Sequence, residues 1–208
     1  MKIHISFDAL DLERIVSMGP LVAPFADGIE IGPLLLVQHG IAILDTFKKT
    51  FPNNAILADT RILDNGKTSM HVFITHKPNW ITVMAGAQNE TIHAVSSTAH
   101  EMRIKVMMNL LDAAAIGQSA MEAKNLGVDA LVFHQVYTER DQITFLDKWD
   151  MVKENTKLPV FIATNITRTT IKEIIALQPD GIVINASVLD VKKPEVEAKF
   201  FYDLCHQT

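Results

Sequence analysis

Charged side chains stand at two places where the sequence otherwise predicts buried strands. Glu30 lies inside a short apolar run at 28–31, and Asp59 and Arg61 directly follow a second run. Burying an unpaired carboxylate is strongly unfavourable, so Glu30 needs a compensating cation. Two kinds are open: a Mg²⁺ ion held by Glu30 and Asp59, whose hard carboxylate oxygens suit this metal, or a salt bridge to Arg61 or Lys105 without a metal.

The segment around Asp59 concentrates further charge. If the strand continues beyond it, alternation places Asp59 and Arg61 on one face, where the two side chains can meet. A solvated turn in which Asp64 or Asn65 caps a helix explains the later residues well. Such a turn does not explain a charged pair directly after an apolar run.

A histidine ends another apolar run. His134 follows Leu131-Val132-Phe133, and a neutral imidazole there could act as an acid, a base or a hydrogen-bond donor. The alternative is a histidine at the edge of the core with no chemical role.

The elements that must position these residues repeat along the chain. Short β-rich apolar runs alternate with longer amphipathic ones, without a linker or a break in composition. Eight such units within 208 residues predict a single (β/α)₈ barrel, an α/β fold of one domain covering 1–208. A doubly wound open sheet is the alternative, and it fits less well because no Gly-x-Gly-x-x-Gly follows the first strand. Strands are predicted at 3–7, 28–31, 55–58, 80–84, 105–110, 130–133, 160–163 and 181–184, and helices at 12–18, 37–49, 67–76, 89–102, 115–126, 141–155, 168–177 and 194–204.

In a parallel barrel, side chains at the carboxyl ends of the strands face a common mouth, where catalysis takes place in this architecture. Seven of the eight predicted strand ends carry a polar residue there. These residues are Asp8, Glu30, Asp59, Asn109, His134, Thr164 with Asn165, and Asn185.

Composition narrows the choice of partner. The formal net charge of −5 gives no broad basic surface, which argues against nucleic acid and anionic membranes. Cys205 has no second cysteine with which to form an internal disulfide, and no apolar run approaches the roughly 20 residues that span a bilayer. Without an export signal at the first strand, a cytoplasmic protein with a small-molecule ligand is expected.

Four segments of the chain form a recognisable set of motifs. They are Phe7-Asp8-Ala9-Leu10, Glu30-Ile31-Gly32-Pro33-Leu34, Ala58-Asp59-Thr60-Arg61-Ile62-Leu63-Asp64-Asn65-Gly66, and Leu126-Gly127-Val128-Asp129 leading into Phe133-His134. Together they resemble the orotidine-phosphate-decarboxylase suprafamily, and most closely its hexulose-6-phosphate synthases and 3-keto-L-gulonate-6-phosphate decarboxylases. The resemblance covers nearly the whole chain.

The resemblance implies a Mg²⁺-dependent carbon–carbon lyase, a decarboxylase or aldolase, that forms an enediolate from a small sugar phosphate or sugar acid. Glu30 and Asp59 match the metal-binding carboxylates, and His134 matches a residue that handles protons. Asp64 matches an acid that reaches the neighbouring subunit's site, which implies a homodimer with shared active sites. Asp59, Arg61, Asp64 and His134 are thus expected to be catalytic, and Asp8, Asn109, Thr164, Asn165 and Asn185 to bind the substrate.

The sequence also departs from this family. Arg61 stands in place of a lysine, and a planar guanidinium does not replace an ammonium that can donate a proton. Asn109 stands where a carboxylate is usual, while Thr164-Asn165 and Asn185-Ala186 replace the glycine pairs of the phosphate loops. Thr164, Thr167 and Arg168 could form a different anion site at the start of the seventh helix. The alternative to an enzyme is therefore an inactive barrel of this family that acts as a binding or assembly protein.

Overall fold

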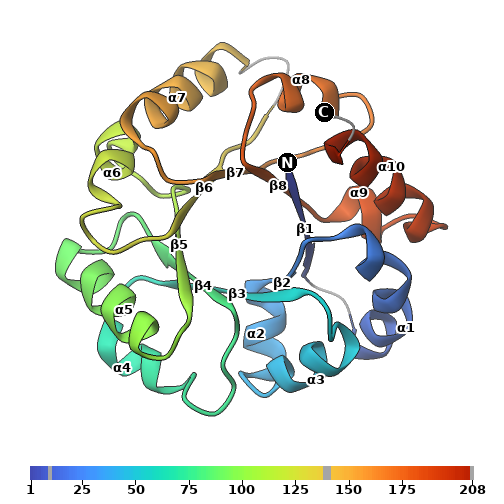
Figure 1. Ribbon diagram of the computed structural model, residues 1–208, viewed down its shortest axis with the longest axis horizontal. Helices are drawn as coiled ribbons and strands as arrows, with labels where there is room; N and C mark the ends of the chain where they lie inside the picture. The colour runs from blue at the N-terminus through green and yellow to red at the C-terminus, as the bar shows by residue number, and fades with distance from the viewer. Residues whose placement is uncertain (9–10, 138–141, 207–208) are drawn as a thin grey trace.

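A closed barrel of eight parallel strands forms the centre of the molecule, as Figure 1 shows looking into the barrel. The computed structural model describes residues 1–8, 11–137 and 142–206. Each strand pairs with its neighbour in the chain, and β1 also pairs with β8 to close the ring. The predicted (β/α)₈ fold is confirmed. The strands are β1 (Lys2–Phe7), β2 (Gly28–Ile31), β3 (Ala55–Ile62), β4 (Trp80–Met84), β5 (Lys105–Asn109), β6 (Ala130–His134), β7 (Val160–Ala163) and β8 (Gly181–Ile184).

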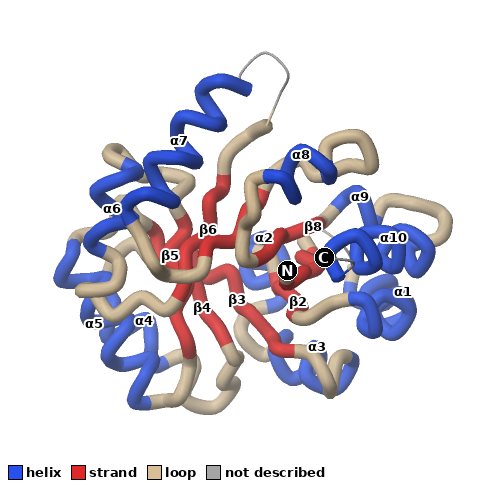
Figure 2. Tube along the Cα trace, turned by 45° about the horizontal axis from the view of Figure 1, so that its top comes forward, coloured by secondary structure: helices blue, strands red, loops and turns tan. Residues whose placement is uncertain are grey.

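Helices surround the barrel and lie between successive strands in the chain (Figures 1 and 2). A 3₁₀ turn, η1 (Ala23–Phe25), follows the first helix. The helices are α1 (Leu12–Val22), α2 (Pro33–His39), α3 (Ile43–Thr50), α4 (Gly66–His71), α5 (Asn89–Glu101), α6 (Ile116–Glu122), α7 (Gln142–Asn155), α8 (Ile171–Ala176), α9 (Ala186–Leu189) and α10 (Pro194–His206).

The strands are buried on both faces, and each face contributes to a separate apolar cluster. Outward side chains such as Ile5 and Phe133 join the large core beneath the helices. Inward side chains such as Met107 and Phe161 form a second, smaller apolar cluster. Because parallel strands covered on both faces read as continuous apolar runs, the sequence pattern revealed the strands but not which residues face inward.

Inward positions near the carboxyl ends of the strands carry most of the buried polar side chains. Among the described residues, six polar or charged side chains are buried: His4, Ser6, Asp59, Thr82, Ser96 and Asn109. All of these except Ser96, which is on α5, come from the strands. The barrel therefore has an apolar interior that becomes polar towards one end.

Several predicted boundaries are wrong, among them those of the helices expected at 67–76 and 115–126, which end at His71 and Glu122. The helix expected at 37–49 is two helices, since Gly40 adopts φ +68° between α2 and α3, a conformation that side chains disfavour. The first helix does not end at 18 but runs to Val22 with Pro20 inside it. β3 continues to Ile62, four residues beyond the expected end at Ala58.

No helix within the described part of the chain is both long enough and apolar enough to cross a bilayer.

Candidate active site

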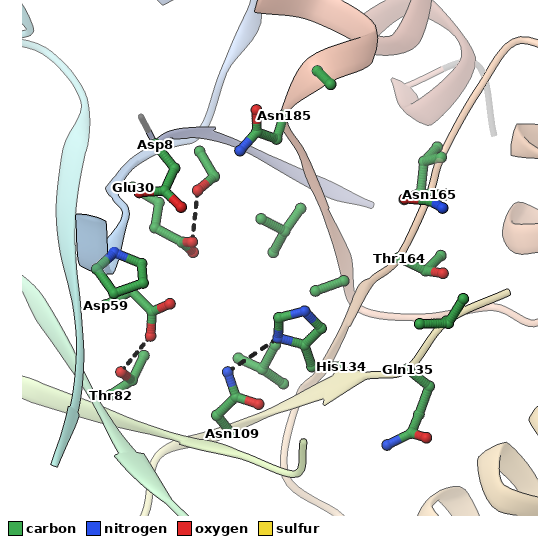
Figure 3. Close-up of a pocket in the computed structure, with 18 of the residues that line it drawn as sticks. Asp8, Glu30, Asp59, Thr82, Asn109, His134, Gln135, Thr164, Asn165 and Asn185 are labelled. Carbon is green, nitrogen blue, oxygen red and sulfur yellow. Dashed lines mark hydrogen bonds between the residues drawn. The ribbon is translucent and has the colours of Figure 1, made fainter. Parts of the chain in front are cut away.

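A cavity of about 670 Å³ opens at the carboxyl ends of the strands. Figure 3 shows its polar side chains converging from opposite sides of the barrel. Nine of the ten predicted site residues line it, and one, Asp64, does not. The nine are Asp8, Glu30, Asp59, Arg61, Asn109, His134, Thr164, Asn165 and Asn185.

Glu30 points inward from β2, and its carboxyl group has a hydrogen-bond partner that the sequence did not predict. Ser6 on the paired strand β1 donates a hydrogen bond to Glu30 Oε1 at 2.8 Å. Burial, and then the nearby charge of Asp59, raise the pKa of Glu30 to about 8. The carboxyl group thus lies in a site that disfavours its charged form.

The expected salt bridges of Glu30 are not found. Arg61 Nε lies 2.9 Å from Asp59 Oδ2 and forms an ion pair with that residue. Lys105 begins β5, at the opposite end of the barrel from the mouth, and its ammonium lies over the Trp80 ring at 5.1 Å. A long side chain is better placed there to pack on an aromatic face than to reach the mouth, so the expectation for Lys105 is wrong.

The predicted meeting of Asp59 and Arg61 is confirmed, and a β-bulge produces it. The register between β3 and β4 shifts between Ala58 and Ile62, and Arg61 adopts φ +47° within this irregular stretch. Thr82 on β4 joins the two residues: its hydroxyl donates to Asp59 Oδ1 at 2.6 Å and accepts from the Arg61 backbone N–H at 2.9 Å. The bulge therefore bends the strand so that both charged side chains reach the mouth.

His134 ends β6 on the opposite wall of the cavity from Asp59 (Figure 3). Burial lowers its pKa, with a further lowering from the charge of Arg61, while Asp59 acts in the opposite direction. The side-chain amide of Asn109 lies 3.3 Å from His134 Nδ1. His134 is therefore neutral near pH 7 and is oriented by a neighbour on β5.

Asp8 has a structural contact as well as a place in the cavity wall. Its Oδ1 accepts a hydrogen bond at 2.9 Å from the backbone N–H of Leu34, in the first turn of α2. Gly32 makes this approach possible, because a Cβ there would lie 2.6 Å from Asp8 Cβ. Asp8 thereby fixes the turn that follows Glu30.

Asp64 does not join the other predicted residues. It is exposed, and it accepts a hydrogen bond at 2.6 Å from the backbone N–H of Asn65. Asn65 precedes α4 in a left-handed conformation, without a capping hydrogen bond from its side chain. The expected side-chain cap is therefore wrong, and Asp64 does not line the cavity of its own chain.

The segments that follow β7 and β8 form another wall of the cavity, and Arg168 does not line it. Thr164 and Thr167 line the cavity, and Thr164 Oγ1 accepts from the backbone N–H of Tyr137 at 2.9 Å. Arg168 is instead directed outward, where its Nε lies 2.9 Å from Glu197 and its guanidinium stacks on the Phe200 ring at 3.9 Å. The suggestion that Arg168 contributes to an anion site is wrong, because this guanidinium already has partners.

The donor set around Glu30 and Asp59 suits a hard cation. Within residues 1–8, 11–137 and 142–206, no three or more histidine, cysteine or acidic side chains gather closely enough to hold a metal by themselves. Mg²⁺ does not require such a group, because it keeps several waters and binds through one or two carboxylates together with a substrate. Two carboxylates close enough to raise a pKa by mutual repulsion are suited to sharing one divalent cation.

Comparison with known proteins identifies the family of the chain. The Orotidine 5'-phosphate decarboxylase / HUMPS family matches residues 1–201. The chain belongs to this family. It is 24% identical over 203 residues to a 3-hexulose-6-phosphate synthase from Staphylococcus haemolyticus, covering 96% of each chain.

Solved structures show the same fold. A 3-hexulose-6-phosphate synthase from Salmonella typhimurium superposes with a TM-score of 0.89 at 22% identity, covering 100% of this chain and 99% of the other. A 3-keto-L-gulonate-6-phosphate decarboxylase from Vibrio cholerae gives 0.81 at 20% identity, covering 98% and 97%. The predicted family is confirmed.

Sequence reasoning missed Ser6 and Thr82, which contact the two carboxylates. Both are inward-facing residues on strands, and both are small and polar within an apolar run. The register of β1 with β2, which pairs Ser6 with Glu30, is the information that would have identified the first. A polar residue within an apolar strand therefore indicates a site residue once the register with the neighbouring strand is known.

Proposed function

We propose that this protein is a Mg²⁺-dependent carbon–carbon lyase, a decarboxylase or aldolase, that acts on a small sugar phosphate or sugar acid. The observation that carries the proposal is the carboxylate pair Glu30 and Asp59 in one cavity with Arg61 and His134. The relatives named 3-hexulose-6-phosphate synthase support this class of reaction.

Glu30 and Asp59 would hold the metal. A bound divalent cation would stabilise the negative charge that develops on the oxygens of an enediolate. Arg61 orients the Asp59 carboxylate through the 2.9 Å ion pair. An arginine guanidinium is not a proton donor in proteins, so proton delivery to carbon must come from His134 or water.

Binding of Mg²⁺ is the first test, and titration calorimetry measures it directly. The parent should bind, and Glu30→Gln should bind much more weakly, because it removes one of the two carboxyl groups that would hold the metal. Asp150→Asn is a matched control, since Asp150 is exposed on the outer helix α7. If Glu30→Gln binds Mg²⁺ as well as the parent, the metal role of Glu30 is wrong.

Enediolate formation is the second test. The probes are ribulose 5-phosphate and 3-keto-L-gulonate 6-phosphate, each with its unphosphorylated counterpart. An enzyme that forms the enediolate from a ribulose should exchange a carbon-bound hydrogen for deuterium in D₂O, and one that forms it from a keto-gulonate should release CO₂ and add deuterium to the carbon that carried the carboxylate. NMR detects both, and we expect Mg²⁺-dependent deuterium exchange or incorporation on at least one probe, lost in Glu30→Gln.

The second candidate is an inactive barrel that binds or assembles. The observation that favours it is the engagement of Arg61 with Asp59, because this cation cannot act as the lysine's proton donor. Mg²⁺ binding without exchange on any of the four probes would support this candidate and contradict the lyase.

We further propose a homodimer whose subunits share active sites. Asp64 is exposed outside its own cavity, as a residue that acts in a partner's site must be. Exposed apolar side chains lie on α2 and in segments after β3 and β6 at the mouth, among them Val37 at 85%, Leu63 at 53% and Val136 at 67% exposure. Light scattering at micromolar concentration should give the mass of a dimer, whereas a monomer would remove the shared-site proposal.

A further inference from the structure

Asn109 makes two hydrogen bonds that together determine how its amide is oriented. Asn109 ends β5, is buried, and points into the barrel towards His134 on β6 (Figure 3). The backbone N–H of Leu111 lies 3.0 Å from Asn109 Oδ1. A backbone N–H can only donate, so the oxygen of the side-chain amide must face Leu111. The NH₂ group therefore faces the other way, towards His134.

This orientation determines which ring nitrogen of His134 carries the proton. Asn109 Nδ2 lies 3.3 Å from His134 Nδ1. An NH₂ group donates and does not accept, so Nδ1 must be the acceptor and cannot carry a hydrogen. In a neutral imidazole the proton is then on Nε2, the nitrogen that Figure 3 shows turned towards the open cavity.

We propose that Asn109 is a positioning residue that holds His134 as the Nε2–H tautomer, so that the imidazole presents a hydrogen-bond donor to the ligand. The effect reaches back to the backbone N–H of Leu111, which fixes the direction of both hydrogen bonds. A carboxylate at position 109 would accept from Nδ1–H instead and would leave Nε2 as an acceptor facing the cavity.

The tautomer restricts what His134 can do, and this consequence rests on the proposed function. A neutral Nε2–H donor can stabilise a carbonyl or enediolate oxygen by hydrogen bonding. It cannot remove a proton from the substrate, because Nε2 has no free lone pair in this tautomer. Nor can it readily protonate carbon, because losing the Nε2 proton would leave an imidazolate anion. His134 is thus directed at oxygen, and water becomes the source of the proton on carbon.

Long-range ¹H–¹⁵N NMR of the histidine rings tests the proposal, because the nitrogen shifts distinguish the two neutral tautomers. The spectrum is recorded at pH 8 without ligand, and His134→Gln assigns the signal by its disappearance. The parent should show Nε2–H, and Asn109→Asp should move the proton to Nδ1. Asn165→Asp adds the same charge to the cavity wall without touching His134 and should leave the tautomer unchanged.

The spectrum of the parent protein tests the proposed tautomer even if Asn109→Asp fails to fold. An Nδ1–H tautomer in the parent would overturn the proposal, as would an unchanged tautomer in folded Asn109→Asp. Because no substrate or metal is present, the result is independent of the Mg²⁺ and exchange measurements. A protein without lyase activity could still confirm the tautomer, and an active one could still contradict it.

Discussion

Replacing His4 should make the protein more resistant to acid. His4 points into the barrel from β1 with 4% of its surface exposed, and its ring packs 4.7 Å from the Phe161 ring. No hydrogen-bond partner for its Nδ1 is present among the described residues. Burial, as the main cause, lowers the pKa of His4 from 6.5 to about 4.

The sign follows from the two pKa values. As the pH falls below about 6.5, His4 takes up a proton in the unfolded chain but remains neutral in the folded barrel, which favours unfolding. Stability is therefore lost progressively until the pH reaches about 4, where the folded form is protonated too. The two pKa values differ by about 2.5, which corresponds to about 3 kcal/mol when the transition is complete.

Urea denaturation at pH 7.0, 6.0, 5.0 and 4.5 measures this contribution. His4→Leu removes the titrating group, so its free energy of unfolding should fall less than that of the parent, by about 2 kcal/mol between pH 7.0 and 4.5. His93→Leu is the control, because His93 is exposed on α5. The free energy of unfolding of the parent must be compared with that of the variant at each pH, because Glu30 is present in both proteins and changes their stability with pH in the opposite direction to His4. Parallel pH profiles for parent and His4→Leu would refute the reasoning.

Two further substitutions test the site. Arg61→Lys should raise any residual decarboxylase or aldolase turnover with Mg²⁺, because lysine can donate a proton. The opposite result, high turnover in the parent that disappears in Arg61→Lys, would mean that arginine is the catalytic residue. Gly32→Ala should lower the free energy of unfolding by about 1–3 kcal/mol, because its Cβ would lie 2.6 Å from Asp8. Gly117→Ala in α6, where a Cβ has no contact closer than 3.4 Å, should not be destabilising; equal urea midpoints for the two alanine variants would contradict this.

The fold was predictable because strand and helix patterns repeat, and each repeat is informative by itself. Errors arose where one residue overrode the local pattern. Gly40 divides an amphipathic run with its positive φ, and Pro20 lies inside a helix that was expected to end before it. Neither outcome follows from periodicity, since each depends on how the neighbouring turn packs.

The candidate site was predictable in its charged members but not in its contacts. Glu30 was conspicuous because a carboxylate within an apolar run needs a partner. Which partner it has depends on the register between β1 and β2, which brings Ser6 alongside it. Likewise, Arg61 meets Asp59 only because β3 continues through a bulge, and a bulge has no clear sequence signal here.

At the bulge in β3, the direction of the Arg61 side chain and the chemistry of its tip depend on different features of the structure. Thr82 holds the Arg61 backbone N–H and the Asp59 carboxylate with the same hydroxyl, so the backbone and its neighbour set the direction of the side chain. A change at the tip of that side chain therefore leaves the contact of Asp59 with Thr82 in place, although it alters the ion pair. On the proposed function, position 61 can therefore carry a different charged group while Glu30 and Asp59 keep their role in metal binding.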